Sequence, residues 1–384
     1  MKKKKLSFCF LVCLLILFIS ACGSAEQTKE QINGIKYKES FDEEEENNDI
    51  KTENETVNAE EINPEINIDE NNGERNNSEE LYIFNKEFDE PGSNDSYKNI
   101  AVFCVDSTKG ILDSKTKSKG IMIFSVNERT KEVKVVNIQH LMYWNIDGAD
   151  KYQQAWYGYY DGPAAAISAL NRNLDMAITD YITIGFEGME QLAASVGGIQ
   201  VYVDETEMEK LNEKEGTKYL PDYLEENLTV IENSGLQTLD SGLSVAYFMG
   251  HLRGIGNSVQ VVERQQEVIN NLALKLMVMD SQQVEIIFDD LYSNYISTSL
   301  GKDDYFDFVN QIVDSGISKT YCFPTKSLSE TNVLGSNGTC MCTSDLKQSV
   351  IDMQQFLFMN KSYQSSQGLE DTSLKLQEKI ASYN

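Results

Sequence analysis

From Asn99 onward, short apolar runs alternate with longer amphipathic stretches, which is the pattern of a sheet covered by helices. Three apolar runs lie close together along the chain and are predicted to be strands, at 99–106, 120–127 and 132–139. A helix is predicted to begin near Pro163, because proline is favoured in a first helical turn and apolar residues recur at helical spacing after it.

A second group of elements follows this helix. "YITIGF" is predicted to be a strand, "EGMEQLAASVGG" a helix that ends at its two glycines, and "IQVYVD" another strand. Strand, helix and strand joined by short connections predict a right-handed parallel crossover. Two further amphipathic helices are predicted at 259–279 and 344–359. The pattern predicts an α/β fold in which helices cover both faces of a mixed sheet.

The first 22 residues indicate where the protein is found. "MKKKK" is followed by an apolar run and then by small residues, which is the layout of a secretory signal over 1–21, and the run is shorter than a bilayer-spanning helix. "ISAC" is similar to a bacterial lipobox, so Cys22 is expected to carry lipid and to hold the protein at the outer face of the membrane. An uncleaved signal anchor is the alternative. Both place the rest of the chain outside the cytoplasm.

Residues 22–96 are expected to be a disordered acidic tether. Between 23 and 96 there are 23 acidic and 6 basic side chains, too much charge and too little apolar surface to form a core. The folded domain is predicted at 97–362, with a polar C-terminal tail over 363–384. From 97 onward, 38 acidic and 23 basic side chains leave the chain acidic, which argues against a nucleic-acid partner.

Several familiar kinds of site are absent from the sequence. It has no glycine-rich phosphate loop, no zinc-type spacing and no G-x-S-x-G motif, and it has two histidines in all. Arg264, Gln265 and Gln266 lie in the first turns of the helix predicted at 259–279. A guanidinium at a helix N-terminus can bind an oxyanion through two hydrogen bonds. The alternative is an arginine on a solvated helix face.

Several motifs together carry a resemblance. "NIAVFCVDS", "YITIGFEGMEQLAASVGGIQVYV" and "LDSGLSVAYFMGHLRGIGNSVQVVERQQEVI" are similar to the LytR-CpsA-Psr family, over about 97–360. The resemblance implies a three-layer α/β/α sandwich with a central mixed sheet. It also implies a phosphotransferase that moves a glycopolymer from a polyprenyl-pyrophosphate carrier to peptidoglycan, with the prenyl chain in an apolar pocket and Mg²⁺ on the pyrophosphate.

The chain departs from this pattern where the family carries charge. Asp106 is kept as the expected catalytic and metal-binding acid, but Thr108 replaces the arginine that follows it in the family. In the family's Arg-Ser-Asp-Thr-Met motif, Lys117 takes the place of the arginine and Lys119 that of the aspartate. His140 stands where Ile-Pro-Arg-Asp-Thr has its arginine.

The later loop shows the same loss. His251 again takes an arginine position, although Arg253 is near, and only Arg264-Gln265-Gln266 is intact. Histidine has an ordinary pKa of roughly 6.5 and offers fewer donors than arginine. Because one lost charged donor costs about 10²–10³ in rate, the resemblance favours a weakened or non-catalytic member.

The expected ligands are a polyprenyl (pyro)phosphate or a cell-wall glycan, and a partner enzyme is a third possibility. Their contacts are expected from Asp106, Arg264 and a group of basic and amide side chains, namely Lys117, Lys119, His140, His251, Arg253, Gln265 and Gln266. The alternative is an active transferase that uses relocated Lys109, Lys117, Lys119 and Arg253.

Two residue groups leave alternatives open. A run of aromatic and apolar side chains either lines the pocket mouth or packs the core: Met142, Tyr143, Trp144, Trp156, Tyr157, Tyr159 and Tyr160. The oxidising location predicts a disulfide from Cys322 to Cys340 or Cys342, which lie on flanking strands, whereas Cys104 is expected to be an inert buried thiol.

Overall fold

The computed structural model describes residues 97–107, 112, 115–213, 220–250, 258–325, 328–331, 340–359 and 362–382. All of them belong to one compact unit. The predicted signal, Cys22 and the acidic tether lie outside the described residues. None of the helices in the described ranges combines the length and apolarity needed to cross a bilayer.

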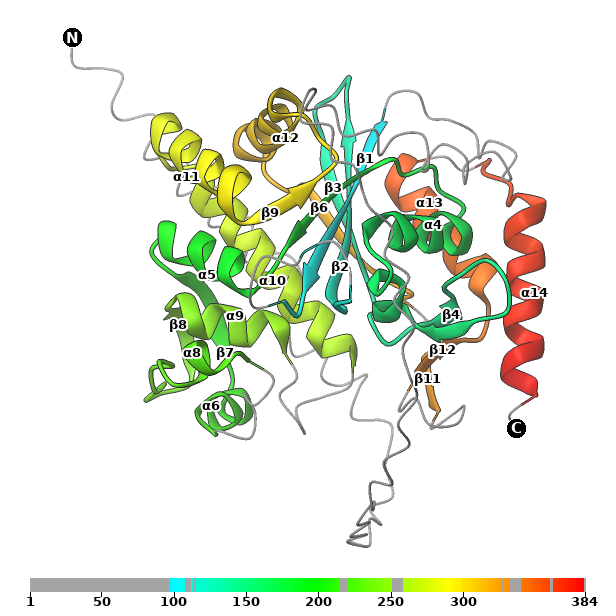
Figure 1. The fold of residues 1–384 in the computed structure, drawn as a ribbon, viewed down its shortest axis with the longest axis horizontal. Coiled ribbons are helices and arrows are strands. Elements are labelled where there is room, and N and C mark those ends of the chain that lie inside the picture. The colour runs from blue at the N-terminus through cyan, green and yellow to red at the C-terminus, as the bar shows by residue number, and fades with distance from the viewer. Residues whose placement is uncertain are drawn as a thin grey trace, which may run out of the picture. The chain divides into compact units, whose positions relative to one another are not determined.

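A six-stranded mixed sheet forms the centre of the described fold, in the order β10-β3-β2-β1-β6-β9 (Figure 1). In the same order, the strands are β10 (Lys319–Phe323), β3 (Val133–Ile138), β2 (Ser118–Asn127), β1 (Tyr97–Val105), β6 (Asp180–Ile184) and β9 (Ile296–Thr298). β1 and β6 are parallel, as are β3 and β10, while β2 is antiparallel to both β1 and β3. The carboxyl ends of β1, β3, β6 and β10 therefore meet at one edge, here called the carboxyl edge, where β2 begins.

Helices cover both faces of this sheet (Figure 1). One face, here the α10 face, is covered by α5 (Phe186–Ser195), α9 (Ser241–Met249), α10 (Ser258–Leu276), α11 (Ser281–Asn294) and α12 (Lys302–Ser315). The other, here the α4 face, is covered by η2 (Ala155–Tyr159), α4 (Pro163–Leu174), α13 (Leu346–Phe358) and α14 (Gln367–Ala381). The predicted α/β/α sandwich with a mixed sheet is confirmed.

Alternation along the strands explains why the central runs are almost continuously apolar. Met122 and Phe124 of β2 pack into the core of the α10 face, whereas Ile121 and Ile123 pack into that of the α4 face. A strand covered on both sides shows little alternation in its sequence. The predicted helices over 259–279 and 344–359 are formed as α10 and α13, and Pro163 is the first residue of α4.

The smaller elements lie around this sandwich. α6 (Glu205–Asn212) and α8 (Asp222–Glu225) follow β7, and three two-stranded sheets pair β4 (Tyr143–Asn145) with β5 (Tyr152–Gln154), β7 (Ile199–Val203) with β8 (Gly235–Leu239), and β11 (Leu328–Thr331) with β12 (Cys340–Thr343).

The predicted parallel crossover from β6 to β7 is wrong. β7 pairs with β8 outside the central sheet, and the free edge of β6 is taken by β9. The reason lies in burial: Ile199, Val201 and Val203 are buried, whereas Gln200 and Tyr202 between them are exposed. A strand with one wet face fits a ribbon on the surface better than a sheet enclosed by helices.

The predicted polar tail over 363–384 is also wrong, because most of it forms α14. The side chain of Ser366 caps this helix by accepting from Leu369 N, and Leu369 and Leu376 are buried in the core of the α4 face. Asp175, which ends α4, accepts hydrogen bonds from Ser366 N and Ser366 Oγ at 3.0 and 2.6 Å. A few buried leucines are enough to hold a helix whose remaining positions are polar.

The structure does not form the predicted disulfide from Cys322 to Cys340 or Cys342. Cys322 has a free thiol on β10, and its neighbour Phe323 points into the α4-face core that contains Cys340 and Cys342. Alternation therefore turns Cys322 to the other side of the sheet, where its Sγ accepts from Gln139 Nε2 at 3.5 Å. Burial raises the pKa of the Cys322 thiol to about 11 and that of the Cys104 thiol to about 12, which makes both unreactive.

Candidate functional site

Four of the predicted site residues meet at the carboxyl edge. Asp106 follows β1, Lys117 and Lys119 lie at the start of β2, and His140 follows β3. Two hydrogen bonds join the first pair: Asp106 N donates to Lys117 O at 3.1 Å, and Lys117 N donates to Asp106 Oδ1 at 2.8 Å. The carboxylate is therefore fixed to the strand that carries both lysines.

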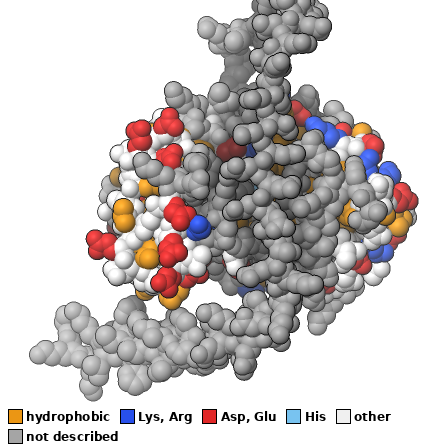
Figure 2. All heavy atoms as spheres, turned by 90° about the horizontal axis from the view of Figure 1, so that it is seen from below, with side chains coloured by type: hydrophobic (Ala, Val, Ile, Leu, Met, Phe, Trp, Pro, Cys, Tyr) orange, Lys and Arg blue, Asp and Glu red, His pale blue; other side chains and the backbone are white. Residues whose placement is uncertain are grey.

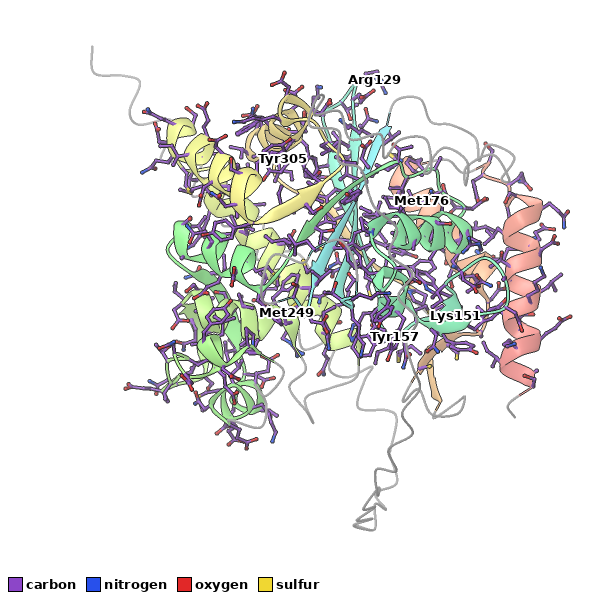
Figure 3. The ribbon with its side chains drawn as sticks, in the orientation of Figure 1. Arg129, Lys151, Tyr157, Met176, Met249 and Tyr305 are labelled. Atoms are coloured by element: carbon purple, nitrogen blue, oxygen red, sulfur yellow. The ribbon has the colours of Figure 1, made fainter. Side chains whose placement is uncertain are left out.

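The two lysines share one aromatic ring. Lys119 Nζ lies 4.4 Å and Lys117 Nζ 4.9 Å from the centre of the Trp156 ring, and Lys117 Nζ is also 4.9 Å from that of Tyr157. Figure 3 labels Tyr157 on the side of the molecule where β1 ends. Lys117, Lys119 and Trp156 are here called the Lys–Trp cluster. An indole face attracts an ammonium group through its ring quadrupole.

The charge of the Lys–Trp cluster is shaped by burial and by its neighbours. The pKa of Lys119 is lowered to about 8, chiefly by desolvation on burial; the charge of Asp106 opposes this shift, and the charge of Lys117 adds a smaller contribution to it. Lys119 is therefore still largely charged at neutral pH but loses its proton more readily than an exposed lysine.

His140 does not reach into open space. It is 1% exposed, its ring centre lies 5.8 Å from that of Trp156, and its carbonyl accepts from Trp156 N at 3.0 Å. The histidine thus supports the tryptophan rather than presenting a donor at the surface. The sequence gives no signal that His140 contacts Trp156, because Trp156 is only one of several aromatic residues in this part of the chain.

Arg264 is held inside the protein. It is 3% exposed, with Nη1 3.4 Å from Glu207 Oε1 and Nη2 donating to Gly250 O at 3.2 Å. Glu207 belongs to the capping box of α6, and burial raises its pKa despite the nearby guanidinium. The predicted oxyanion donor is therefore engaged by a carboxylate that sequence reasoning did not identify.

The neighbouring glutamines take different positions. Gln265 is fully buried, and its Nε2 donates to Lys119 O at 3.2 Å and to Phe248 O at 3.3 Å. It therefore ties α10 and α9 to the start of β2. Gln266 is only half-buried. Lys109, His251 and Arg253 lie outside the described residues.

An apolar cavity of about 190 Å³ lies on the α10 face, between the sheet and the helices. Its walls include Met122 and Phe124 of the sheet and Leu272 and Ala273 of α10. Cys104 and Phe248, which also line it, lie against Gly120, the residue that follows Lys119. The cavity and the Lys–Trp cluster therefore both adjoin the start of β2, but on opposite sides of the sheet.

The aromatic run divides between core and site. Met142, Tyr143, Trp144 and Tyr159 are buried in the core of the α4 face, as the packing alternative proposed. Trp156 and Tyr157 contact the lysines instead. Tyr160, which is 40% exposed, lies beneath Lys115 Nζ at 4.8 Å.

The described donors near Asp106 do not fit Mg²⁺. This ion prefers an octahedral set of oxygen ligands. Within the described ranges no three histidine, cysteine or acidic side chains are grouped to hold a metal, and Asp106 lies near the charged Lys119, on which Lys117 also acts. Two ammonium groups would repel a divalent cation at this position.

Acidic side chains mark much of the outer surface. Figure 2 shows them spread over the described surface on the left, the side of α6 and α8 in Figure 1. Several lysine and arginine side chains lie on the described surface on the right of the same view.

Comparison with known proteins gives a family match. Residues 34–341 match the model of the LytR_cpsA_psr family. The chain is similar to "Polyisoprenyl-teichoic acid--peptidoglycan teichoic acid transferase TagU" of Bacillus cereus, with 28% identity over 93 residues, which are 24% of this chain and 31% of that relative. The protein of the same name from Enterococcus faecalis is 22% identical over 195 residues, 46% of this chain and 57% of the relative. The chain thus spans between 31% and 57% of the length of these curated relatives.

Solved structures show the same fold. TagT bound to LIIa-WTA is 17% identical, with a TM-score of 0.52 over 70% of this chain and 91% of that one. TagV of B. subtilis is 15% identical, with a TM-score of 0.53 over 70% and 99% of the two chains. At these identities the likeness establishes the fold.

Proposed function

The chain belongs to the LytR_cpsA_psr family, and from that premise we propose that it binds a polyprenyl (pyro)phosphate or the glycan attached to it, with weakened or no transfer to peptidoglycan. The apolar cavity carries this proposal. It is walled by aliphatic and aromatic side chains, two of which lie against Gly120, and the ammonium groups of Lys117 and Lys119 lie at the same end of β2 on the opposite side of the sheet. A lipid with an anionic head group combines an apolar chain, which suits the cavity, with a negative charge, which suits the two ammonium groups.

Weak transfer is proposed because the charged groups needed for catalysis are engaged or replaced. Phosphoryl transfer depends almost wholly on positioning and on stabilising developing negative charge. Arg264 is paired with Glu207, His140 is enclosed, and the donors around Asp106 do not suit Mg²⁺. The TagU relatives are named as teichoic acid transferases, which makes the polyprenyl-linked glycan the natural ligand class to test.

The test separates binding from transfer. Full-length protein in detergent micelles is titrated with polyprenyl phosphate, and release of polyprenyl phosphate from a polyprenyl-pyrophosphate oligosaccharide is followed with peptidoglycan and Mg²⁺. We expect saturable binding and little or no release. Efficient release would instead establish the active transferase, and absence of binding would contradict the proposal.

A pair of neighbouring variants tests the cavity itself. Ala273 lines the cavity and is 3% exposed, whereas Leu274 is 59% exposed. Ala273→Phe should fill the cavity and abolish lipid binding, while Leu274→Phe should leave it unchanged. Circular dichroism and thermal melting show whether each variant is folded. Equal binding by both folded variants would place the lipid elsewhere.

We also propose that the protein is held at the outer face of the cell membrane through lipid on Cys22. The proposal rests on "ISAC" after the apolar run. Metabolic labelling with a fatty acid should mark the wild-type protein and not Cys22→Ser, and the variant should leave the membrane fraction. A labelled, membrane-bound variant would show a different anchor.

A further inference from the structure

We infer that Lys119 supplies, from within the chain, the positive charge that the family resemblance assigns to Mg²⁺, so that this site binds a phosphate or diphosphate without a divalent metal. The inference deepens the proposed function and rests on it for the identity of the natural ligand. It does not depend on that function for the anion-binding chemistry.

Lys119 is held at a defined place. Its carbonyl accepts from the buried Gln265, and Gly120, the next residue, pairs with Cys104 of β1. Its Nζ lies 4.4 Å from the Trp156 ring centre. Both the backbone and the charged end of the side chain are thus positioned by contacts, although lysine itself is a flexible residue.

The described charged groups around Lys119 carry an excess of positive charge, which favours binding of an anion. Among the described residues the charged groups that act on Lys119 are Asp106 and Lys117, so two ammonium groups face one carboxylate. Asp106 also accepts from Lys117 N, which uses part of its capacity. A single carboxylate beside two cations is a poor cation site, whereas the surplus positive charge suits a phosphate oxygen.

Trp156 is the positioning residue of this arrangement. Its ring receives both ammonium groups, and its backbone N–H is fixed by the carbonyl of His140. Two like charges repel each other, and a shared aromatic face lowers the cost of keeping them together. The indole thereby makes a two-lysine anion site from side chains that would otherwise separate.

The experiment measures metal dependence directly. Inorganic pyrophosphate and polyprenyl phosphate are each titrated into full-length protein in detergent micelles, with EDTA and then with Mg²⁺. We expect equal affinity of the wild-type protein under both conditions. Lys119→Gln should weaken both ligands by about tenfold, the loss of one charge-assisted hydrogen bond. Lys119→Asp should bind weakly in EDTA and recover with Mg²⁺, because it restores a second carboxylate.

Lys302→Gln is the matched control, since Lys302 is an exposed lysine of α12 whose ammonium group pairs with Asp289 of α11. It should bind both ligands as the wild type does, and thermal melting confirms that each variant is folded. Wild-type binding that requires Mg²⁺, or unchanged affinity of folded Lys119→Gln, would overturn the inference. Pyrophosphate binding without lipid binding would support anion binding by the lysines and refute the proposed polyprenyl phosphate ligand. Lipid binding that requires Mg²⁺ would support the proposed lipid ligand and refute metal-free binding by Lys119.

Discussion

Arg264 and Glu207 form an ion pair with Nη1 and Oε1 3.4 Å apart, and their side chains are only 3% and 12% exposed. The pair joins α10 to α6. It also engages with a carboxylate the guanidinium that the intact Arg-Gln-Gln motif was expected to offer to an anion. The arginine is therefore retained with a structural use.

Removing the carboxylate of this pair should destabilise the protein. Glu207→Gln keeps an oxygen that can accept from Arg264 but removes the negative charge beside the buried guanidinium, and breaking a buried ion pair costs about 3 kcal/mol. Chemical denaturation measures the free energy of unfolding. Glu205→Gln, an exposed position on the same helix, is the control and should change it by less than about 0.5 kcal/mol. Equal stability of both variants would show that the pair is unimportant.

Anion binding should depend on pH through Lys119. Burial lowers the pKa of this lysine to about 8, so the charged form that binds anions dominates below that pH and is lost as pH rises through it. Pyrophosphate affinity should therefore fall between about pH 7 and 9. Because pyrophosphate titrates as well, the comparison is the difference between the wild type and Lys119→Gln at each pH. Parallel curves would contradict the prediction.

Trp156 should influence affinity through the lysines. Trp156→Leu removes the aromatic face that both ammonium groups contact, and pyrophosphate affinity should fall by about fivefold to tenfold, equivalent to roughly 1 kcal/mol or more. Trp156→Phe keeps an aromatic ring and should recover most of the affinity. A structural role alone would lower the melting temperature of both variants without this difference in binding.

A substitution at Gly120 should affect the cavity more than the anion site. An added Cβ would lie 3.0 Å from Cys104 Cβ and 3.1 Å from Phe248 Cε1, so Gly120→Ala pushes on two cavity-lining side chains. We expect a loss of about 1–3 kcal/mol in stability and weaker polyprenyl phosphate binding, with pyrophosphate affinity less affected. Gly301→Ala is the control, since its nearest neighbour would be 3.9 Å away. Equal loss for both ligands would mean that the two sites are not distinct.

Sequence reasoning located many of the elements and named several residues that lie together at the site. The apolar runs of β1, β2 and β3, the proline at the start of α4 and the stripe of α10 each report burial within a single element. Asp106 and His140 follow the ends of β1 and β3, and Lys117 and Lys119 lie at the start of β2, so the antiparallel pairing of β2 brings all four to one edge of the sheet. The resemblance supplied the sandwich.

The partners of these elements could not be obtained in this way. Periodicity shows that one side of β7 or α14 is buried but not which element covers it, so it predicts the wrong sheet for β7 and a tail in place of α14. Cys322 shows the same limit, because the face on which it lies depends on the pairing of β10 with β3.

The sequence by itself determined the acidity of the chain and its central strands, and the family resemblance led to the expectation that arginines of the family pattern are replaced. The tertiary structure decided that Arg264 meets Glu207, 57 residues away, and that two lysines share the ring of Trp156. The physical reason is that charge and hydrophobicity belong to single residues. The use of a charge depends on which opposite charge or aromatic face lies beside it, and that neighbour is fixed only when distant parts of the chain pack together.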